Sequence, residues 1–188
     1  MNRIVLRFCA AAIALLPAAA SAHPGIAGHT HGFAYGLAHP LGGIDHVLAM
    51  VAVGMFAAHL GGRALWLLPL TFVSAMALAG IAGMTGLALP FVEIGIGLSV
   101  VVLGLAVALQ WNMPALAAMG LVGFFAVFHG YAHGAEASGL AYGAGFVCAT
   151  ALLHSVGIGL GLAIRNRRMV HFVGAAISLA GVAILAAS

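Results

Sequence analysis

The sequence is poor in charge. Of its 188 residues only 5% are Asp, Glu, Lys or Arg, lysine is absent, and just three residues are acidic. A soluble domain typically carries about 25% charged residues, so this chain cannot cover a water-exposed surface. Disordered chains, coiled coils and nucleic-acid-binding proteins also need more charge than this. An integral membrane protein remains, and the 64% hydrophobic content agrees with that class.

The first 22 residues have the pattern of a secretory signal peptide. Arg3 and Arg7 precede a short apolar run, and Ala20–Ala22 matches the small-residue cleavage site of such signals. A retained transmembrane helix is the alternative, but the run is short for one and Pro17 interrupts it. We therefore expect the mature chain to begin at His23. Cleavage also removes one of the two cysteines, which excludes an internal disulfide in the mature chain.

Six apolar stretches follow, each close to the roughly 20 residues that a membrane helix needs. They are residues 41–60, 65–83, 88–109, 115–133, 140–164 and 170–187. We predict an all-α polytopic membrane protein, a bundle of six transmembrane helices after a cleaved signal peptide. Residues 23–188 would form one domain, in which 23–39 are a His- and Gly-rich leader outside the membrane. Pro40 would occupy the first position of the first helix.

Arginine predicts the orientation of the bundle. If the signal places His23 outside the cytoplasm, then Arg63, Arg165, Arg167 and Arg168 all fall in cytoplasmic loops. This agrees with the positive-inside rule and leaves both mature termini outside.

Glycines recur at helical spacings, and small residues let membrane helices approach closely. The pairs are Gly130 and Gly134, Gly139 and Gly143, and Gly157 and Gly161. They predict a compact bundle and carry no chemistry.

An ionisable group inside a membrane is costly, so by default it is functional or paired. His39 and His46 are seven residues, or two helical turns, apart near the start of the first helix, so we expect them on nearly one face. Asp45 lies beside them, and Glu93 lies near the start of the third helix.

A second polar group ends the fourth helix. His129 and His133 are spaced i, i+4, and Glu136 joins their stripe if the helix continues that far. Two imidazoles at this spacing with a carboxylate are a metal-ligand arrangement.

The predicted topology brings both groups to one depth near the outer face. Neighbouring carboxylates repel, and a divalent cation relieves that repulsion. Imidazole and carboxylate together suit Ni²⁺, Co²⁺, Zn²⁺ or Fe²⁺ better than Cu⁺. The candidate metal ligands are His39, Asp45, His46, Glu93, His129, His133 and Glu136.

Four further histidines are weaker candidates. His154, deeper in the fifth helix, is either a second metal station or an ordinary core histidine. His23, His29 and His31 either capture metal in the leader or are incidental to a flexible segment.

Two stretches resemble the HupE/UreJ family, small bacterial nickel permeases tied to hydrogenase and urease maturation. One is Gly32 to Gly54, with its His-Pro-(x)4-Asp-His core, and the other is Phe128 to Glu136. The resemblance implies transport of Ni²⁺, and in some members Co²⁺, from the periplasm across the inner membrane. It also implies that the metal-handling residues are His39, Asp45, His46, Glu93, His133 and Glu136.

No phosphate-binding G-x-x-x-x-G-K-[ST] loop occurs, so we expect a secondary transporter, not an enzyme, with no resident cofactor. Its expected partners are a divalent metal ion, the lipid bilayer and metalloenzyme maturation proteins, and no nucleic acid. Two other readings stay open. Paired helical histidines also ligate haem in membrane redox proteins, and a non-transporting assembly factor for a metalloenzyme would bind a partner without moving metal.

Overall fold

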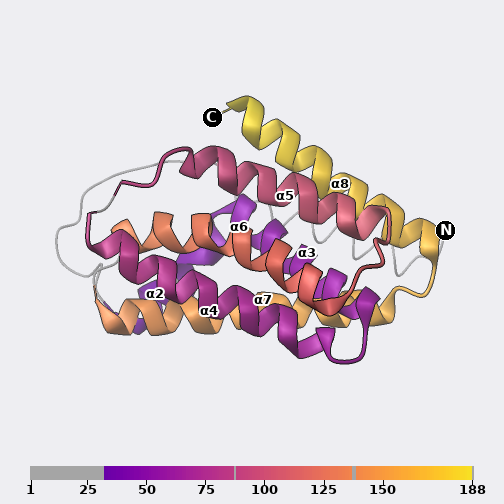
Figure 1. The fold of residues 1–188 in the computed structure, drawn as a ribbon, viewed down its shortest axis with the longest axis horizontal. Coiled ribbons are helices and arrows are strands. Elements are labelled where there is room, and N and C mark those ends of the chain that lie inside the picture. The colour runs from indigo at the N-terminus through magenta and orange to yellow at the C-terminus, as the bar shows by residue number, and fades with distance from the viewer. Residues whose placement is uncertain (1–31, 87, 137–138, 188) are drawn as a thin grey trace.

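The computed structural model describes residues 32–86, 88–136 and 139–187 (Figure 1). Every regular element in these residues is a helix, which confirms the all-α prediction. The helices are α2 (Phe33–Gly42), α3 (Ile44–Leu60), α4 (Ala64–Met84), α5 (Val92–Ala108), α6 (Ala115–Glu136), α7 (Leu140–Ala163) and α8 (Arg167–Ala187). The predicted apolar stretches correspond to α3 through α8, with ends shifted by a few residues.

Helix length and hydropathy identify a multi-pass membrane protein. The helices α4, α6, α7 and α8 are each long and apolar enough to cross a membrane. The pair α2 and α3 passes the same test together, although it is bent by 87°. The apolar helix α5 has 17 residues, slightly fewer than the roughly 20 that span a bilayer without tilt or thinning.

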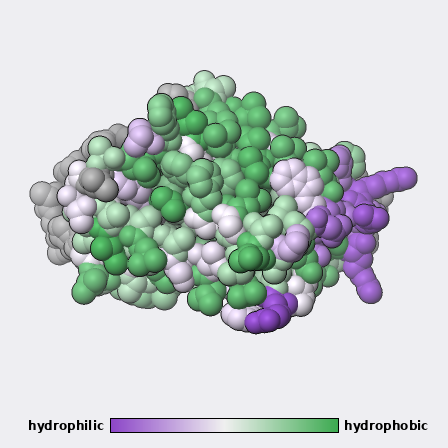
Figure 2. Space-filling view, in the orientation of Figure 1, coloured by the Kyte–Doolittle hydropathy of each residue, from purple (hydrophilic) through white to green (hydrophobic). Residues whose placement is uncertain are grey.

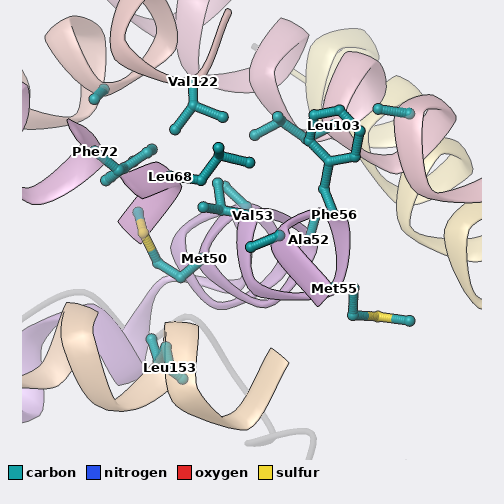
Figure 3. Close-up of a cluster of buried hydrophobic side chains, with 14 of the residues drawn as sticks. Met50, Ala52, Val53, Met55, Phe56, Leu68, Phe72, Leu103, Val122 and Leu153 are labelled. Atoms are coloured by element: carbon teal, nitrogen blue, oxygen red, sulfur yellow. The ribbon is translucent and has the colours of Figure 1, made fainter. Parts of the chain in front are cut away.

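Three helix pairs build the bundle: α4 with α6, α3 with α7, and α5 with α8. The pair α5 and α8 lies along one edge of the molecule, and α4 and α7 lie along the opposite edge (Figure 1). Helix α3 runs between the two edges and contacts α4, α5, α6 and α7. It is apolar on all sides, as a buried helix must be, and supplies much of the core around Met50, Val53 and Phe56 (Figure 3).

Two of the predicted glycine pairs hold helices together. A Cβ atom at Gly130 or Gly134 would clash with the backbone of α4. A Cβ atom at Gly157 or Gly161 would likewise clash with α3. Successive residues of α6 meet successive residues of α4, and the same holds for α7 and α3, so both pairs run parallel. The prediction of close helix contact is confirmed for these pairs.

The prediction is wrong for Gly139 and Gly143. A Cβ atom built at either would have no neighbour within 4 Å. Gly139 is instead the residue before α7 and has a φ of 126°, a backbone conformation that residues with a Cβ rarely adopt.

The start of the bundle differs from the sequence expectation. Residues 33–39, expected in the leader, form most of α2, which packs against α7. Pro40 lies in the last turn of α2 and not at the first position of the next helix. Helix α3 begins only at Ile44. The break falls at the Gly42–Gly43 pair, where the helix is weakened because each helical glycine costs about 1 kcal/mol relative to alanine.

The charged residues that the structure describes lie at or near the ends of the helices. Figure 2 shows hydrophilic residues gathered at one end, while the rest of the coloured face is mostly hydrophobic. Arg63, Arg165, Arg167 and Arg168 are exposed where α3 passes to α4 and α7 passes to α8. Because α3 and α7 are parallel, these four residues share one end of the bundle, here called the arginine end.

Candidate metal-binding site

A cleft of about 520 Å³ lies at the other end of α3, here called the cleft end of the bundle. Four predicted ligands line it: His39, Asp45, Glu93 and His133. They come from α2, α3, α5 and α6, and they meet because α3 and α5 begin at this end while α6 ends here. The expected convergence of these side chains is confirmed.

A continuous series of rings leads from the cleft into the bundle. The ring centroids of His39 and His133 are 4.9 Å apart, and those of His133 and His46 are 4.2 Å apart. His46 and His129 follow at 4.5 Å. We call these four side chains the imidazole column. Burial increases along it, because His39 and His133 are partly exposed while His46 and His129 are 2% and 0% exposed.

The reason for the meeting of His39 and His46 is not the predicted one. The two residues do not share the face of one helix, because the break at Gly43 separates them. Instead, the rings of both residues contact the ring of His133 on α6. The bend between α2 and α3 allows His39 to form the cleft end of the column.

A hydrogen-bond chain fixes the proton positions at the base of the column. Ser99 Oγ donates its single proton to the Ile96 carbonyl at 2.6 Å, so it can only accept from His129 Nε2 at 2.8 Å. Neutral His129 then carries its lone pair on Nδ1 and accepts from His46 Nε2 at 3.0 Å. Neutral His46 is left with a lone pair on Nδ1.

That lone pair lies beside a carboxylate. His46 Nδ1 and Asp45 Oδ1 are 3.7 Å apart, which is too long for a hydrogen bond. It is a suitable spacing for two ligands of one divalent ion, since metal–ligand bonds of this kind are about 2.0–2.2 Å long. Gly43 leaves the space open, because a Cβ there would lie 2.7 Å from Asp45 Oδ1.

His129 has a different position from the one predicted. Both of its ring nitrogens are hydrogen bonded, one to Ser99 and one to His46, so in this arrangement it orients His46 and does not face the cleft. In the part of the chain that the structure describes, no three His, Cys, Asp or Glu side chains are already arranged to hold a metal ion. The cleft gathers donor groups without forming a closed metal cage.

The remaining predicted ligands are only partly described. Helix α6 does continue to Glu136, as the stripe required, but the Glu136 side chain lies outside the described residues. His23, His29 and His31 also lie outside them. His154 is 1% exposed in the interior of the bundle, away from the cleft.

Two residues of this region had no signal in the sequence. Ser99 is one serine in the apolar helix α5, where a hydroxyl ordinarily bonds to its own helix. Phe72 is one of ten phenylalanines, and only the fold places its ring 5.7 Å from that of His129. From the sequence alone, neither residue could be distinguished from an ordinary core residue.

Comparison with known proteins identifies the family of the chain. Residues 11–184 match the family described as HupE / UreJ protein. The chain belongs to the HupE/UreJ family. A similar HupE/UreJ protein is Protein HupE of Rhizobium leguminosarum bv. viciae, which is 45% identical over 177 residues, covering 90% of this chain and 92% of the relative. No solved structure matches the chain. The HupE/UreJ match includes both motif stretches, and the cleft is where the two stretches meet.

Proposed function

We propose that this protein is a secondary transporter that moves Ni²⁺, with Co²⁺ as the second candidate ion, from the periplasm to the cytoplasm. The observation that carries the proposal is the imidazole column, which descends from a cleft with carboxylates into the interior of an apolar bundle. Membership of the HupE/UreJ family supports nickel as the ion and hydrogenase or urease maturation as its use. Ligand chemistry alone would also admit Zn²⁺ and Co²⁺.

Capture begins in the cleft. Asp45 and the Nδ1 atom of His46 supply one carboxylate and one imidazole to the incoming ion. His39, Glu93 and His133 line the same cleft and complete the coordination by small side-chain movements. An open set of ligands suits a carrier, because a transported ion must bind strongly enough to enter and weakly enough to leave.

Six crossings account for the apolar helices. The bent pair α2 and α3 forms one crossing, α5 forms a short one, and α4, α6, α7 and α8 form the others. With the arginine end in the cytoplasm, the cleft faces the periplasm and both mature termini are periplasmic. The membrane potential then draws the cation inward, by about 4.6 kcal/mol for a divalent ion at 100 mV.

The geometry disfavours a bis-histidine haem at the buried pair. His46 Nε2 and His129 Nδ1 are 3.0 Å apart in a direct hydrogen bond, so no porphyrin plane fits between the two rings. An absorption spectrum of the purified protein tests this reading, and a Soret band would support it over transport.

Proteoliposomes test the proposal against both a redox protein and an assembly factor. The purified protein is reconstituted with a metal-sensitive dye inside, an inward-negative potential is imposed, and Ni²⁺ is added outside. We expect potential-dependent Ni²⁺ entry that Co²⁺ inhibits more strongly than Zn²⁺ does. Entry no faster than in protein-free liposomes would contradict the proposal and favour the assembly factor.

A further inference from the structure

His154 is a buried histidine whose hydrogen-bonding capacity is unused. Its side chain is 1% exposed, and neither ring nitrogen has a hydrogen-bond partner among the described residues. Buried polar side chains nearly always have such a partner, so an exception needs an explanation. An apolar residue of similar volume would fill the same space without that cost.

The position of His154 continues the imidazole column. Helix α6 ends, and α7 begins, at the same end of the bundle, so depth can be counted along both helices. At about 1.5 Å per residue, His129 lies roughly 10 Å from the end of α6 and His154 roughly 21 Å from the start of α7. His154 therefore lies one level deeper than the base of the column, towards the arginine end.

The two imidazoles lean towards each other. Helical side chains tilt towards the N-terminus of their own helix. The N-terminus of α7 is at the cleft end and that of α6 is at the arginine end. The side chain of His154 therefore tilts towards the cleft end, and that of His129 tilts towards the arginine end. The ring of Phe72 on α4 contacts both, with its centroid 5.7 Å from that of His129 and 5.2 Å from that of His154.

The nearby polar group on α7 does not serve His154. Thr150, one turn earlier, donates its hydroxyl proton to the Phe146 carbonyl at 3.0 Å, with a weaker contact to Met76 Sδ at 3.8 Å. The backbone of α7 is also fixed here, because a Cβ at Gly54 would clash with the His154 carbonyl. The backbone at His154 is thus held against α3 while its ring reaches Phe72 on α4.

We propose that His154 is an inner binding station for the transported cation, which reaches it from the imidazole column past the ring of Phe72. This inference rests on the proposed transport function and adds a second station to it. A neutral imidazole with an unshared lone pair is a ligand for borderline cations such as Ni²⁺ and Co²⁺. The station explains why the two buried ring nitrogens have no partner in the described part of the chain.

The first test separates binding in the cleft from passage through the bundle. The full-length variants His154→Leu and His154→Gln are compared with Thr150→Val, a change on the same buried face. Equilibrium Co²⁺ binding is followed by visible absorption in detergent, and Ni²⁺ entry is followed in proteoliposomes. We expect both His154 variants to keep Co²⁺ binding at the cleft but to lose Ni²⁺ entry by about tenfold or more. Thr150→Val should retain both.

The second test has a readout that a purely structural role would not change. A thiolate prefers softer cations than an imidazole does. In His154→Cys we expect the rate of Cd²⁺ entry relative to Ni²⁺ entry to rise by about fivefold or more, and in the neighbouring Leu153→Cys we expect no change. This ratio still tests the inner station if His154→Leu and His154→Gln do not fold.

The outcomes are distinguishable. Wild-type protein that does not admit Ni²⁺ overturns the proposed function, and the station with it. Wild-type transport with unchanged Ni²⁺ entry in the His154 variants, or an unchanged Cd²⁺ to Ni²⁺ ratio in His154→Cys, overturns the inner station alone.

Discussion

His46 and His129 are joined by a hydrogen bond of 3.0 Å between Nε2 and Nδ1, although they are 83 positions apart in the chain. The bond links α3 to α6 and directs the other nitrogen of His46 towards Asp45. It therefore divides the histidines into two kinds. His46 presents a ligand atom beside the cleft, and His129 holds that atom in place.

Ser99→Ala should impair metal handling without touching any residue of the cleft. The change leaves the Nε2 proton of His129 without an acceptor, at a cost of about 1–3 kcal/mol, and releases the His129 tautomer that orients His46. Loss of such orienting partners lowers metal affinity by about 10–100-fold. Co²⁺ titration of the purified variant measures the effect. Ser155→Ala is the control, because that exposed hydroxyl donates to the Ala151 carbonyl of its own helix. Equal affinities in both variants would refute the positioning role.

Gly43→Ala should block the cleft while leaving the fold intact. Its φ of −100° and ψ of 115° are open to any residue, so alanine adds no backbone strain. The new Cβ would lie 2.7 Å from Asp45 Oδ1 and push the carboxylate away from His46 Nδ1. We expect Ni²⁺ entry to fall by about tenfold.

Gly42→Ala is the matched control for this substitution. Gly42 also lines the cleft, but a Cβ there would have no neighbour within 4 Å. Thermal unfolding checks that both variants are folded. If Gly42→Ala reduces entry as much as Gly43→Ala does, crowding at Asp45 is not the cause.

Gly130→Ala should destabilise the bundle. The added Cβ would meet the Met76 carbonyl, where α6 lies against the backbone of α4. Overpacking of this kind costs about 1–3 kcal/mol. Gly120→Ala lies on the same helix with nothing within 4 Å of the new Cβ, and we expect no loss of stability there. Unfolding in detergent compares the two, and equal stability would argue against tight α4–α6 packing.

The mature chain should begin at His23. The cleavage pattern Ala20-Ser21-Ala22 ends there, and the intact mass of protein purified from membranes measures the result directly. Ala20→Arg should prevent cleavage and leave the longer chain as its control. Recovery of wild-type protein that still carries residues 1–22 would show that the first apolar run is a retained anchor.

Length and hydropathy were enough to predict α3 through α8, because each of these helices is a long apolar run and so leaves a strong signal. The convergence of His39, Asp45, Glu93 and His133 was also predictable, since alternating helix directions determine which helix ends meet. The bend at Gly43 was not. Whether a Gly-Gly pair continues or breaks a helix depends on the packing of α2 against α7.

The hydrogen-bond partners in the interior of the site were less predictable from the sequence. His129 was assigned as a ligand because i, i+4 spacing shows which residues share a face but not which of them reaches the cleft. Ser99 became informative only once its hydroxyl was found 2.8 Å from His129. Hydrogen-bond partners of this kind lie on different helices, so their pairing appears only when the helices are assembled.

The most direct test of the account is Ni²⁺ accumulation in cells that express Asp45→Asn or His46→Ala at wild-type protein levels. Asp45→Asn removes the negative charge, and His46→Ala removes the imidazole, from the pair that is 3.7 Å apart at the cleft. We expect accumulation to fall to the level of cells without the protein. The control His171→Ala, whose side chain bonds the Ala108 carbonyl away from the cleft, should accumulate Ni²⁺ normally. Unchanged accumulation in both cleft variants would contradict the proposed capture site.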